Sequence, residues 1–330
     1  MAAIPSSDGA SAFVCLMQLI TRDRVYNTMD KAHPPAGWVK SGETVRIQTQ
    51  LQSGDWLNAA GDRWGPSKSR GPNLCTVVGV EGAEPGDTLV VEILDITPGK
   101  LGYTGFAGWR TPLVSRILPE AKEWGTVTHT VEITKQGVLW SPGLTLPLRP
   151  MIGTIGTAPA GEPQTNRYAY HNGGNMDVQE LCAGATLYLP VEVRGALLHV
   201  GDCHAIMGDG EIPHGGAIEC AAEVTLKLSV RKGYAAGEWL RAENAEYIMT
   251  IANEDRIKDS FCGAVRELIR WMCDGYGFSP QEAYLLLGQV LEARCTTLHG
   301  DEGPFSPYVA KIQKRFLKPD SHFDWNGPAE

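Results

Sequence analysis

The sequence lacks any run of 18 apolar residues, so it contains no segment typical of a membrane-spanning helix. Basic residues are also in deficit: 29 Lys and Arg stand against 38 Asp and Glu, which gives a net charge of −9. An acidic surface argues against nucleic acid or an anionic membrane as a partner. The first residues, 1–24, lack a basic region followed by a small-residue cleavage site, so we predict no signal peptide.

Paired cysteine motifs are absent as well. The chain has eight cysteines, but no two of them show the C-x-x-C spacing of zinc ribbons or redox sites. Most lie among apolar neighbours, as buried small hydrophobic residues do. We therefore expect reduced thiols and a cytoplasmic protein.

Short β-rich segments bounded by Gly and Pro dominate the first 235 residues. Several of them alternate apolar and polar residues with a period of two, which is typical of half-buried strands. The predicted strands are 44–50, 75–80, 88–96, 126–133, 186–193, 196–202 and 223–230. So many short strands at this spacing predict a mainly β fold, a sandwich or a barrel.

Helical patterns occur only near the C-terminus. Residues 259–274 place Val265, Leu268 and Met272 on one face, which predicts an amphipathic helix. A second helix is predicted over 279–298, because Ser279, Pro280 and Glu282 form the pattern of a capping box. We predict a β-rich domain over 1–235 that carries most of the site, and an α/β part over 236–330 packed on it as one compact unit.

Acidic residues and histidines are unusually dense between 171 and 223. This segment holds eight carboxylates together with His171, His204 and His214, while Arg167 and Arg194 are the basic residues nearby. Buried carboxylates are costly unless they are paired or bind a metal. Because bases are scarce, a divalent cation explains the acids better than salt bridges do. Carboxylates with imidazole suit zinc or manganese, and carboxylates with backbone carbonyls suit calcium.

The centre of this cluster is GDCHAIMGDGE, residues 201–211. In a strand, Asp202 and His204 point to the same face, and Asp209 and Glu211 do so if their segment is extended. Cys203 then points to the opposite face, which argues against a dyad of Cys203 with His204. Ordinary turns rich in Asp and Gly, or an acid/base site without metal, remain alternatives.

In several segments the sequence resembles the acetamidase/formamidase family. The segments are VEGAEPGDTLVVEILDI (80–96), LPLRPMIGTIGTAPA (146–160), GGNMDVQELCAGATLYLPVEVRGALLHVGDCHAIMGDGE (173–211), AIECAAEVTLKL (217–228) and SPQEAYLLL (279–287). The resemblance implies a β-sandwich-like acetamidase/formamidase fold with additional C-terminal α/β elements, assembled as a homo-oligomer. It also implies hydrolysis of the C–N bond of a small linear amide to ammonia and a carboxylate, in some members with zinc or calcium.

The resemblance carries over a set of site residues, to which we assign roles by inference. The expected metal ligands are Asp177, Asp202, His204 and Asp209. The expected catalytic residues are Glu211 or Glu219 as general base, and Asn175 as a hydrogen-bond donor to the carbonyl oxygen. His214, which the family pattern does not supply, is expected as an extra base, ligand or substrate contact. The chain departs from the family pattern at Met207, where glutamine is frequent, and around His214.

His204 among the acids favours zinc over calcium, which prefers oxygen ligands. The alternative function is a β-sandwich that binds calcium or a carbohydrate without catalysis. The expected partner is a small amide, and neither nucleic acid nor a membrane is expected.

Overall fold

The computed structural model describes residues 17–107, 112–212, 216–234, 237–298 and 306–317. The first part of the chain forms strands β1 (Gln18–Ile20), β2 (Val25–Tyr26), β3 (Thr28–Met29), β4 (Gly37–Lys40), β5 (Glu43–Gln48), β6 (Cys75–Glu81), β7 (Thr88–Ala107), β8 (Thr126–Thr134), β9 (Gly137–Ser141), β10 (Leu144–Leu146) and β11 (Met151–Gly156), with helix α1 (Pro112–Ile117) after β7. The second part forms β12 (Gln164–Thr165), β13 (Ala169–Tyr170), β14 (Gly173–Asn175), β15 (Thr186–Pro190), β16 (Leu198–Met207), β17 (Ala217–Arg231), β18 (Leu240–Glu243), β19 (Tyr247–Ala252), α2 (Ile257–Tyr276), α3 (Pro280–Val290), β20 (Glu292–Cys295) and β21 (Tyr308–Gln313).

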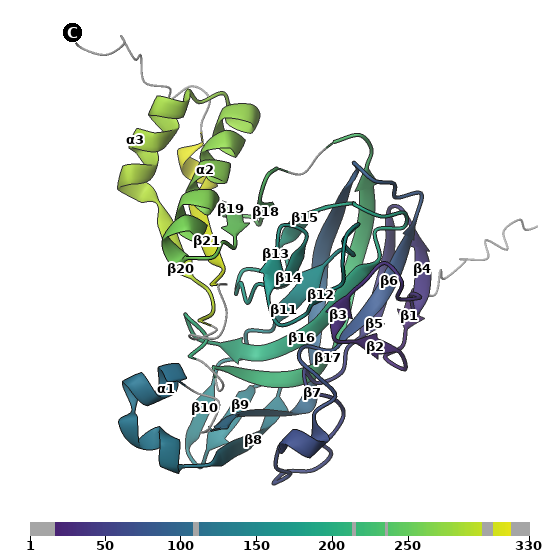
Figure 1. Ribbon diagram of the computed structural model, residues 1–330, viewed down its shortest axis with the longest axis vertical. Helices are drawn as coiled ribbons and strands as arrows, with labels where there is room; N and C mark the ends of the chain where they lie inside the picture. Colours follow the sequence, from purple (N-terminus) through teal and green to yellow (C-terminus); the bar gives the residue numbers. More distant parts are fainter. Residues whose placement is uncertain (1–16, 108–111, 213–215, 235–236, 299–305, 318–330) are drawn as a thin grey trace, which may run out of the picture.

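The long strand β17 is the centre of the fold. It pairs antiparallel with β5, β7 and β16, and these strands curve together through the middle of the molecule (Figure 1). Side chains along β17 alternate between buried and partly exposed, as the period of two predicted for 223–230 requires. Val224, Leu226 and Leu228 thereby enter the main hydrophobic core, which confirms a mainly β protein.

Helices α2 and α3 lie next to β19 and β21 at one end of the molecule, whereas α1 lies near β8 to β10 at the other (Figure 1). A second hydrophobic cluster joins the two C-terminal helices to these strands, and it includes Leu268, Met272 and Leu287. The capping box is present: Ser279 Oγ accepts from the Glu282 backbone N–H, and the Glu282 carboxylate accepts from the Ser279 N–H. Both predicted helices are therefore confirmed in position.

The predicted helix over 279–298 is too long. Helix α3 ends at Val290, and residues Glu292–Cys295 form β20, which pairs with β21. The apolar periodicity continued past the true end because the strand packs against the same hydrophobic cluster.

The division at residue 235 stays a prediction, since 235–236 lie outside the described residues. Strand β18, beyond that point, pairs with β15 and continues the same sheet.

No helix in the described ranges combines the length and the apolar character needed to cross a membrane.

A buried ion pair fastens α2 to the sheet. Arg241 on β18 donates from Nε to Glu267 Oε1 at 2.8 Å and from Nη2 to the same oxygen at 2.7 Å. The side chain of Glu267 is only 1% exposed, and its other oxygen accepts from the Glu238 backbone N–H. Loss of the arginine would leave a carboxylate in the interior with its main positive partner removed.

We therefore predict that Arg241→Met lowers the free energy of unfolding by about 3 kcal/mol, the cost of breaking a buried ion pair. Urea denaturation followed by circular dichroism measures this change. The matched control is Arg256→Met, because Arg256 pairs with Asp259 at 2.6 Å but is 80% exposed. Equal effects of the two substitutions would show that the buried pair does not hold α2.

Candidate functional site

Three strands and one loop assemble the candidate site. The pairing of β16 with β17 places His204 directly opposite Glu219, and β11 places Met151 opposite His204 on the other side. Residues directly opposite one another on antiparallel strands project to the same face of a sheet. Asp177 reaches this face from the segment that follows β14, where its backbone N–H donates to the Gly153 carbonyl oxygen.

The His204 imidazole lies at the centre of the carboxylates. Its Nε2 atom is 3.5 Å from Asp202 Oδ1, 3.5 Å from Glu219 Oε2 and 4.0 Å from Asp177 Oδ1. Two sets of potential ligand atoms share this ring, and in each set all atoms lie within 4.8 Å of one another. The sets are Asp177, His204 and Glu211, and Asp202, His204 and Glu219. We call these five residues the acidic cluster.

The acidic cluster contains polar atoms that the protein itself leaves unsatisfied. Within the described chain, both carboxylate oxygens of Asp177, both ring nitrogens of His204 and Oε2 of Glu219 are buried without a hydrogen-bond partner. Buried polar atoms normally have partners, and the energetic cost of an unpartnered carboxylate is high. A divalent cation bound by carboxylate oxygens and an imidazole nitrogen would satisfy these atoms, and the donor set is one that zinc accepts. The residues present therefore fit a metal.

Mutual proximity and burial shift the pKa values of the cluster. Burial, and next the charges of Glu211 and Asp202, raise the pKa of Asp177 well above its ordinary range. Burial likewise raises the pKa of Glu219, although His204 opposes that shift. Burial alone would lower the pKa of His204, but Glu219, Asp202 and Asp177 outweigh it and raise that pKa well above its ordinary value. The cluster thus retains protons near neutrality unless a cation replaces them.

The backbone at the acidic cluster is conformationally strained. Asp177, Asp202 and Glu211 all have positive φ values, of 48°, 55° and 37° respectively. Residues other than glycine adopt this region rarely, and such strain persists where the surrounding structure imposes it. Half of the positive-φ residues other than glycine in the described chain belong to the cluster. The fold therefore directs these three carboxylates inward at an energetic cost.

Gly153 on β11 leaves the space that the carboxylates occupy. A Cβ atom at this position would stand 2.6 Å from Asp177 Oδ1, 2.7 Å from the Asp202 carbonyl oxygen and 2.9 Å from Asp202 Oδ2. These contacts are too close for any side chain, so only glycine permits both aspartates to approach β11.

Hydrogen bonds from the neighbouring strand orient Asp202. The Thr154 hydroxyl is placed to donate to Asp202 Oδ2 at 3.0 Å or to Asn175 Oδ1 at 2.9 Å, and it accepts from Asn73 Nδ2 at 3.2 Å. The Asn175 amide nitrogen donates to the Arg167 carbonyl oxygen at 3.4 Å. Asn175 is therefore next to the acidic cluster, but its amide already bonds to the protein on both sides.

Asp209 is not brought to the acidic cluster. Its side chain is 73% exposed, and its Oδ1 lies 3.1 Å from Arg294 Nε. Arg294 also donates to Glu180 and to Gln179, and Lys311 pairs with Glu180 as well. Basic residues are scarce near 171–223 in the sequence, which suggested that these acids lack ion-pair partners. In the structure, β20 and β21 supply the basic partners from a distant part of the chain. Salt bridges thus account for Glu180 and Asp209.

Other candidates separate in space. His214 lies outside the described residues. Cys203 faces the main core, where Thr49 donates to its sulfur and burial raises the pKa of its thiol to about 12. This placement agrees with the opposite-face argument against a dyad of Cys203 with His204.

Sequence reasoning did not single out the polar group beside Glu219. Tyr103 on β7 pairs in register with Glu219, and its hydroxyl accepts from Gln52 Nε2 at 2.6 Å. Burial, with a further contribution from Glu219, raises the pKa of Tyr103. Trp56 packs edge-on against Tyr103, with ring centroids 4.7 Å apart. No local motif marks these residues, because the fold alone brings β7 next to Glu219 and the segment 52–56 next to Tyr103.

Known proteins resemble this chain in sequence. The model of the acetamidase/formamidase family matches residues 18–169 and 163–298 of the chain. The chain is 29% identical over 272 residues to a putative formamidase of Schizosaccharomyces pombe, and 27% identical over 263 residues to a formamidase of Methylophilus methylotrophus. These alignments cover 62% and 63% of this chain, and the chain spans 64% of the length of each of the two relatives.

A solved acetamidase from Bacillus halodurans has the same architecture. It superposes with a TM-score of 0.79 at 31% sequence identity, over 91% of this chain and 98% of that one. The sequence match, the shared fold and the residues of the acidic cluster lead to one conclusion: the chain belongs to the acetamidase/formamidase family.

Proposed function

We propose that this protein hydrolyses the C–N bond of a small linear amide, releasing ammonia and a carboxylate, with the help of a divalent cation. The observation that carries the proposal is the ring of buried, unpartnered carboxylate and imidazole atoms around His204. Membership of a family whose named relatives are formamidases and acetamidases supports amide chemistry at this site.

The cation would be held by Asp177, Asp202 and His204, with Glu219 completing the set. The side chains of Asp177, Asp202 and His204 are buried, and that of Glu219 is 14% exposed. The nearest oxygen of each carboxylate lies within 4.0 Å of His204 Nε2. When bound, a divalent cation supplies Lewis-acid polarisation and lowers the pKa of water, both of which amide hydrolysis needs. The imidazole at the centre favours zinc, whereas calcium prefers a shell made of oxygen atoms.

Glu211 is assigned the role of general base. It belongs to the set of ligand atoms with Asp177 and His204, and it is only partly buried. A carboxylate there can take a proton from the attacking water and return it to the amide nitrogen as the C–N bond breaks. Protonation lets the nitrogen leave as ammonia, and the acyl carbon leaves as a carboxylate.

Asn175 acts by positioning. Its amide nitrogen donates to the Arg167 carbonyl oxygen, and its Oδ1 lies 2.9 Å from the Thr154 hydroxyl, which can donate either to Asn175 or to Asp202. Asn175 thereby keeps this hydroxyl next to Asp202. The non-catalytic alternative, a calcium- or carbohydrate-binding β-sandwich, is not favoured, since a buried imidazole at the centre of the acids serves neither purpose well.

The cellular setting belongs to the same proposal. A cytoplasmic location follows from the sequence-based expectation of reduced thiols, and a homo-oligomer follows from the family resemblance. The proposed partner is a small amide substrate.

Removal of the cation tests metal binding and amide hydrolysis together. Removal of metal by a chelator is expected to abolish ammonia release from formamide and acetamide, and added zinc is expected to restore it. His204→Ala is expected to lower bound metal by at least about tenfold while circular dichroism shows a folded chain. Elemental analysis and an ammonia assay measure both effects. Full turnover in a verified metal-free sample would refute the metal-assisted reaction.

A second prediction concerns the space at Gly153. Gly153→Ala is expected to weaken zinc binding by at least about tenfold, because the new Cβ would displace Asp177 and Asp202. Titration calorimetry measures the affinity. Gly161→Ala is the matched control, since a Cβ there meets no atom within 4 Å. Unchanged affinity in Gly153→Ala would mean that the two aspartates do not hold the cation.

A third prediction follows from the raised pKa values. Because Asp177, Glu219 and His204 hold protons more tightly than usual, zinc must displace those protons on binding. Zinc affinity is therefore expected to increase from about pH 6 to about pH 8, by up to about tenfold per pH unit for each proton released. Calorimetry in buffers of different ionisation enthalpy counts the protons.

Asp209→Asn serves as the control for the pH series. Asp209 is exposed and pairs with Arg294 outside the acidic cluster, so the pH slope should not change. A flat pH dependence in the unmodified protein would contradict the assignment of protonated ligands.

A further inference from the structure

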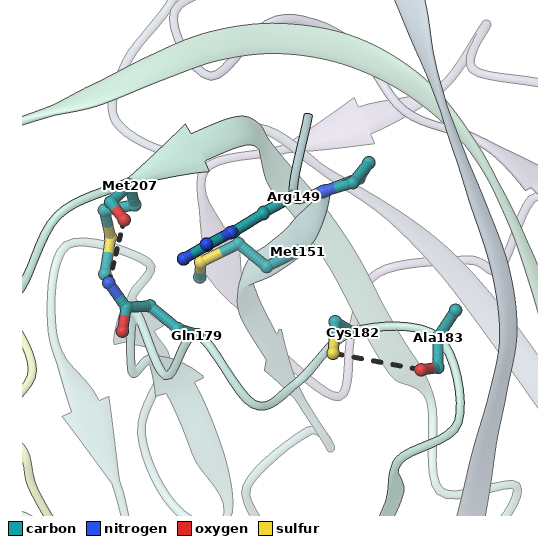
Figure 2. Close-up of a pocket in the computed structure, with 7 residues that line it drawn as sticks. Arg149, Met151, Gln179, Cys182, Ala183 and Met207 are labelled. Atoms are coloured by element: carbon teal, nitrogen blue, oxygen red, sulfur yellow. Dashed lines mark hydrogen bonds between the residues drawn. The ribbon is translucent and has the colours of Figure 1, made fainter. Parts of the chain in front are cut away.

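A pocket lies beside the acidic cluster and has a different chemistry. Its volume is about 340 Å³, and it is lined by Arg149, Pro150, Met151, Gln179, Cys182, Ala183 and Met207 (Figure 2). A cavity of this size accommodates a ligand considerably larger than acetamide, whose acyl part is a single methyl group.

Three residues of the pocket lining are neighbours of the acidic cluster in strand register or along the chain. Met151 is the register partner of His204 on the neighbouring strand, so both side chains project to one face. Met207 follows His204 by three residues on β16, and Gln179 follows Asp177 by two. The Gln179 amide nitrogen donates to the Met207 carbonyl oxygen at 2.8 Å, which closes one wall of the pocket (Figure 2). The pocket therefore adjoins the acidic cluster through Met151, Gln179 and Met207, although no residue of the cluster lines it.

The pocket lining is mostly apolar and contains a single positively charged side chain. Met151 and Met207 are buried and present thioethers, which adapt to aliphatic chains of varied shape. Cys182 adds a third sulfur, and burial raises the pKa of its thiol, so it stays neutral. None of the lining residues is acidic, and Arg149 is the one that carries a positive charge.

Arg149 is available to a ligand. Its backbone N–H is fixed by the Ala205 carbonyl oxygen at 2.9 Å, while its side chain extends beside Met151 toward Met207 and Gln179 (Figure 2). Among the described residues the guanidinium makes neither a hydrogen bond nor an ion pair. Arg149 is exposed, and its planar guanidinium matches the fork geometry of a carboxylate.

From this arrangement we propose that the substrate is the monoamide of a small aliphatic dicarboxylic acid. This inference rests on the proposed amide hydrolysis and names its substrate class. The methionines contact the aliphatic chain, Arg149 binds the free carboxylate, and the amide lies at the acidic cluster. Water adds to the amide carbon, the C–N bond breaks, and the products are ammonia and the dicarboxylate.

The test compares amides that differ only in the distal charge. Succinamate and glutaramate are each assayed against the neutral amides of equal chain length, butanamide and pentanamide, by ammonia release. The charged member of each pair is expected to have a kcat/KM at least about tenfold higher, as a charge-assisted hydrogen bond provides. Equal rates, or a preference for the neutral amides, would overturn the proposal.

Substitution of Arg149 separates the pocket from the cluster. Arg149→Gln is expected to raise KM for succinamate by at least about tenfold, and to change KM for butanamide, which has no carboxylate, by a much smaller factor. Arg149→Lys should recover part of the loss, because the charge is kept. The matched control is Arg194→Gln, an arginine 87% exposed and outside the pocket lining. A KM that does not change in Arg149→Gln would refute the role of Arg149.

Binding measurements distinguish a failure of the proposed amide hydrolysis from a failure of the proposed substrate class. If no amide is hydrolysed, yet calorimetry shows succinamate bound and the binding weakened about tenfold by Arg149→Gln, the pocket assignment holds and amide hydrolysis fails. If amides are hydrolysed but succinamate binding is insensitive to Arg149→Gln, hydrolysis holds and the substrate class is wrong.

Discussion

The structure depends on one electrostatic constraint, the confinement of several carboxylates around a single buried imidazole. His204 Nε2 has three carboxylate oxygens within 4.0 Å, and atoms of His204, Asp177 and Glu219 are buried without hydrogen bonds in the described chain. Like charges this close repel strongly at low dielectric, and the raised pKa values express that repulsion. A cation removes the conflict, whereas a protein interior without one must keep the groups protonated. The same feature that is unfavourable for folding is therefore what makes the site able to hold a metal.

The surrounding fold is arranged to impose this constraint. Antiparallel pairing of β11, β16 and β17 fixes His204 between Met151 and Glu219, with no freedom to slip, because a shift of one residue would turn His204 into the core. Positive φ values turn Asp177 and Asp202 toward the ring, and Gly153 leaves them room. Arg294 ties the segments that follow Asp177 and His204 to β20 through Gln179, Glu180 and Asp209. The C-terminal strands thus support a site whose charged groups come from the central sheet.

In the proposed function, the acidic cluster and the neighbouring pocket bind different parts of the substrate. The acidic cluster suits a cation and the reacting amide, which need dense negative charge. The pocket suits an aliphatic chain and a distant anion, because thioethers line it and Arg149 stands at its edge. In the proposed substrate, Arg149 binds the free carboxylate and leaves the uncharged amide for the acidic cluster.

Local patterns were sufficient for much of this description. Period-two alternation located β5, β6, β7, β8, β15, β16 and β17, and the capping residues located the start of α3, because these signals arise from near neighbours. The same alternation placed Asp202 and His204 together and Cys203 on the opposite face. The density of acids indicated a metal site before any geometry was known, and the quoted motifs indicated the family that the comparisons confirm.

Contacts between distant segments were beyond the reach of the sequence. The sequence by itself determined seven of the strands, the two late helices and the family, and all five members of the acidic cluster were among its candidate residues. Only the tertiary structure decided that Asp209 pairs with Arg294 instead of joining the cluster, that Tyr103 stands beside Glu219, and that Arg149 faces a pocket next to His204. The physical reason is that alternation and capping depend on residues a few positions apart, whereas ion pairs and pockets depend on how strands far apart in the chain are brought into register.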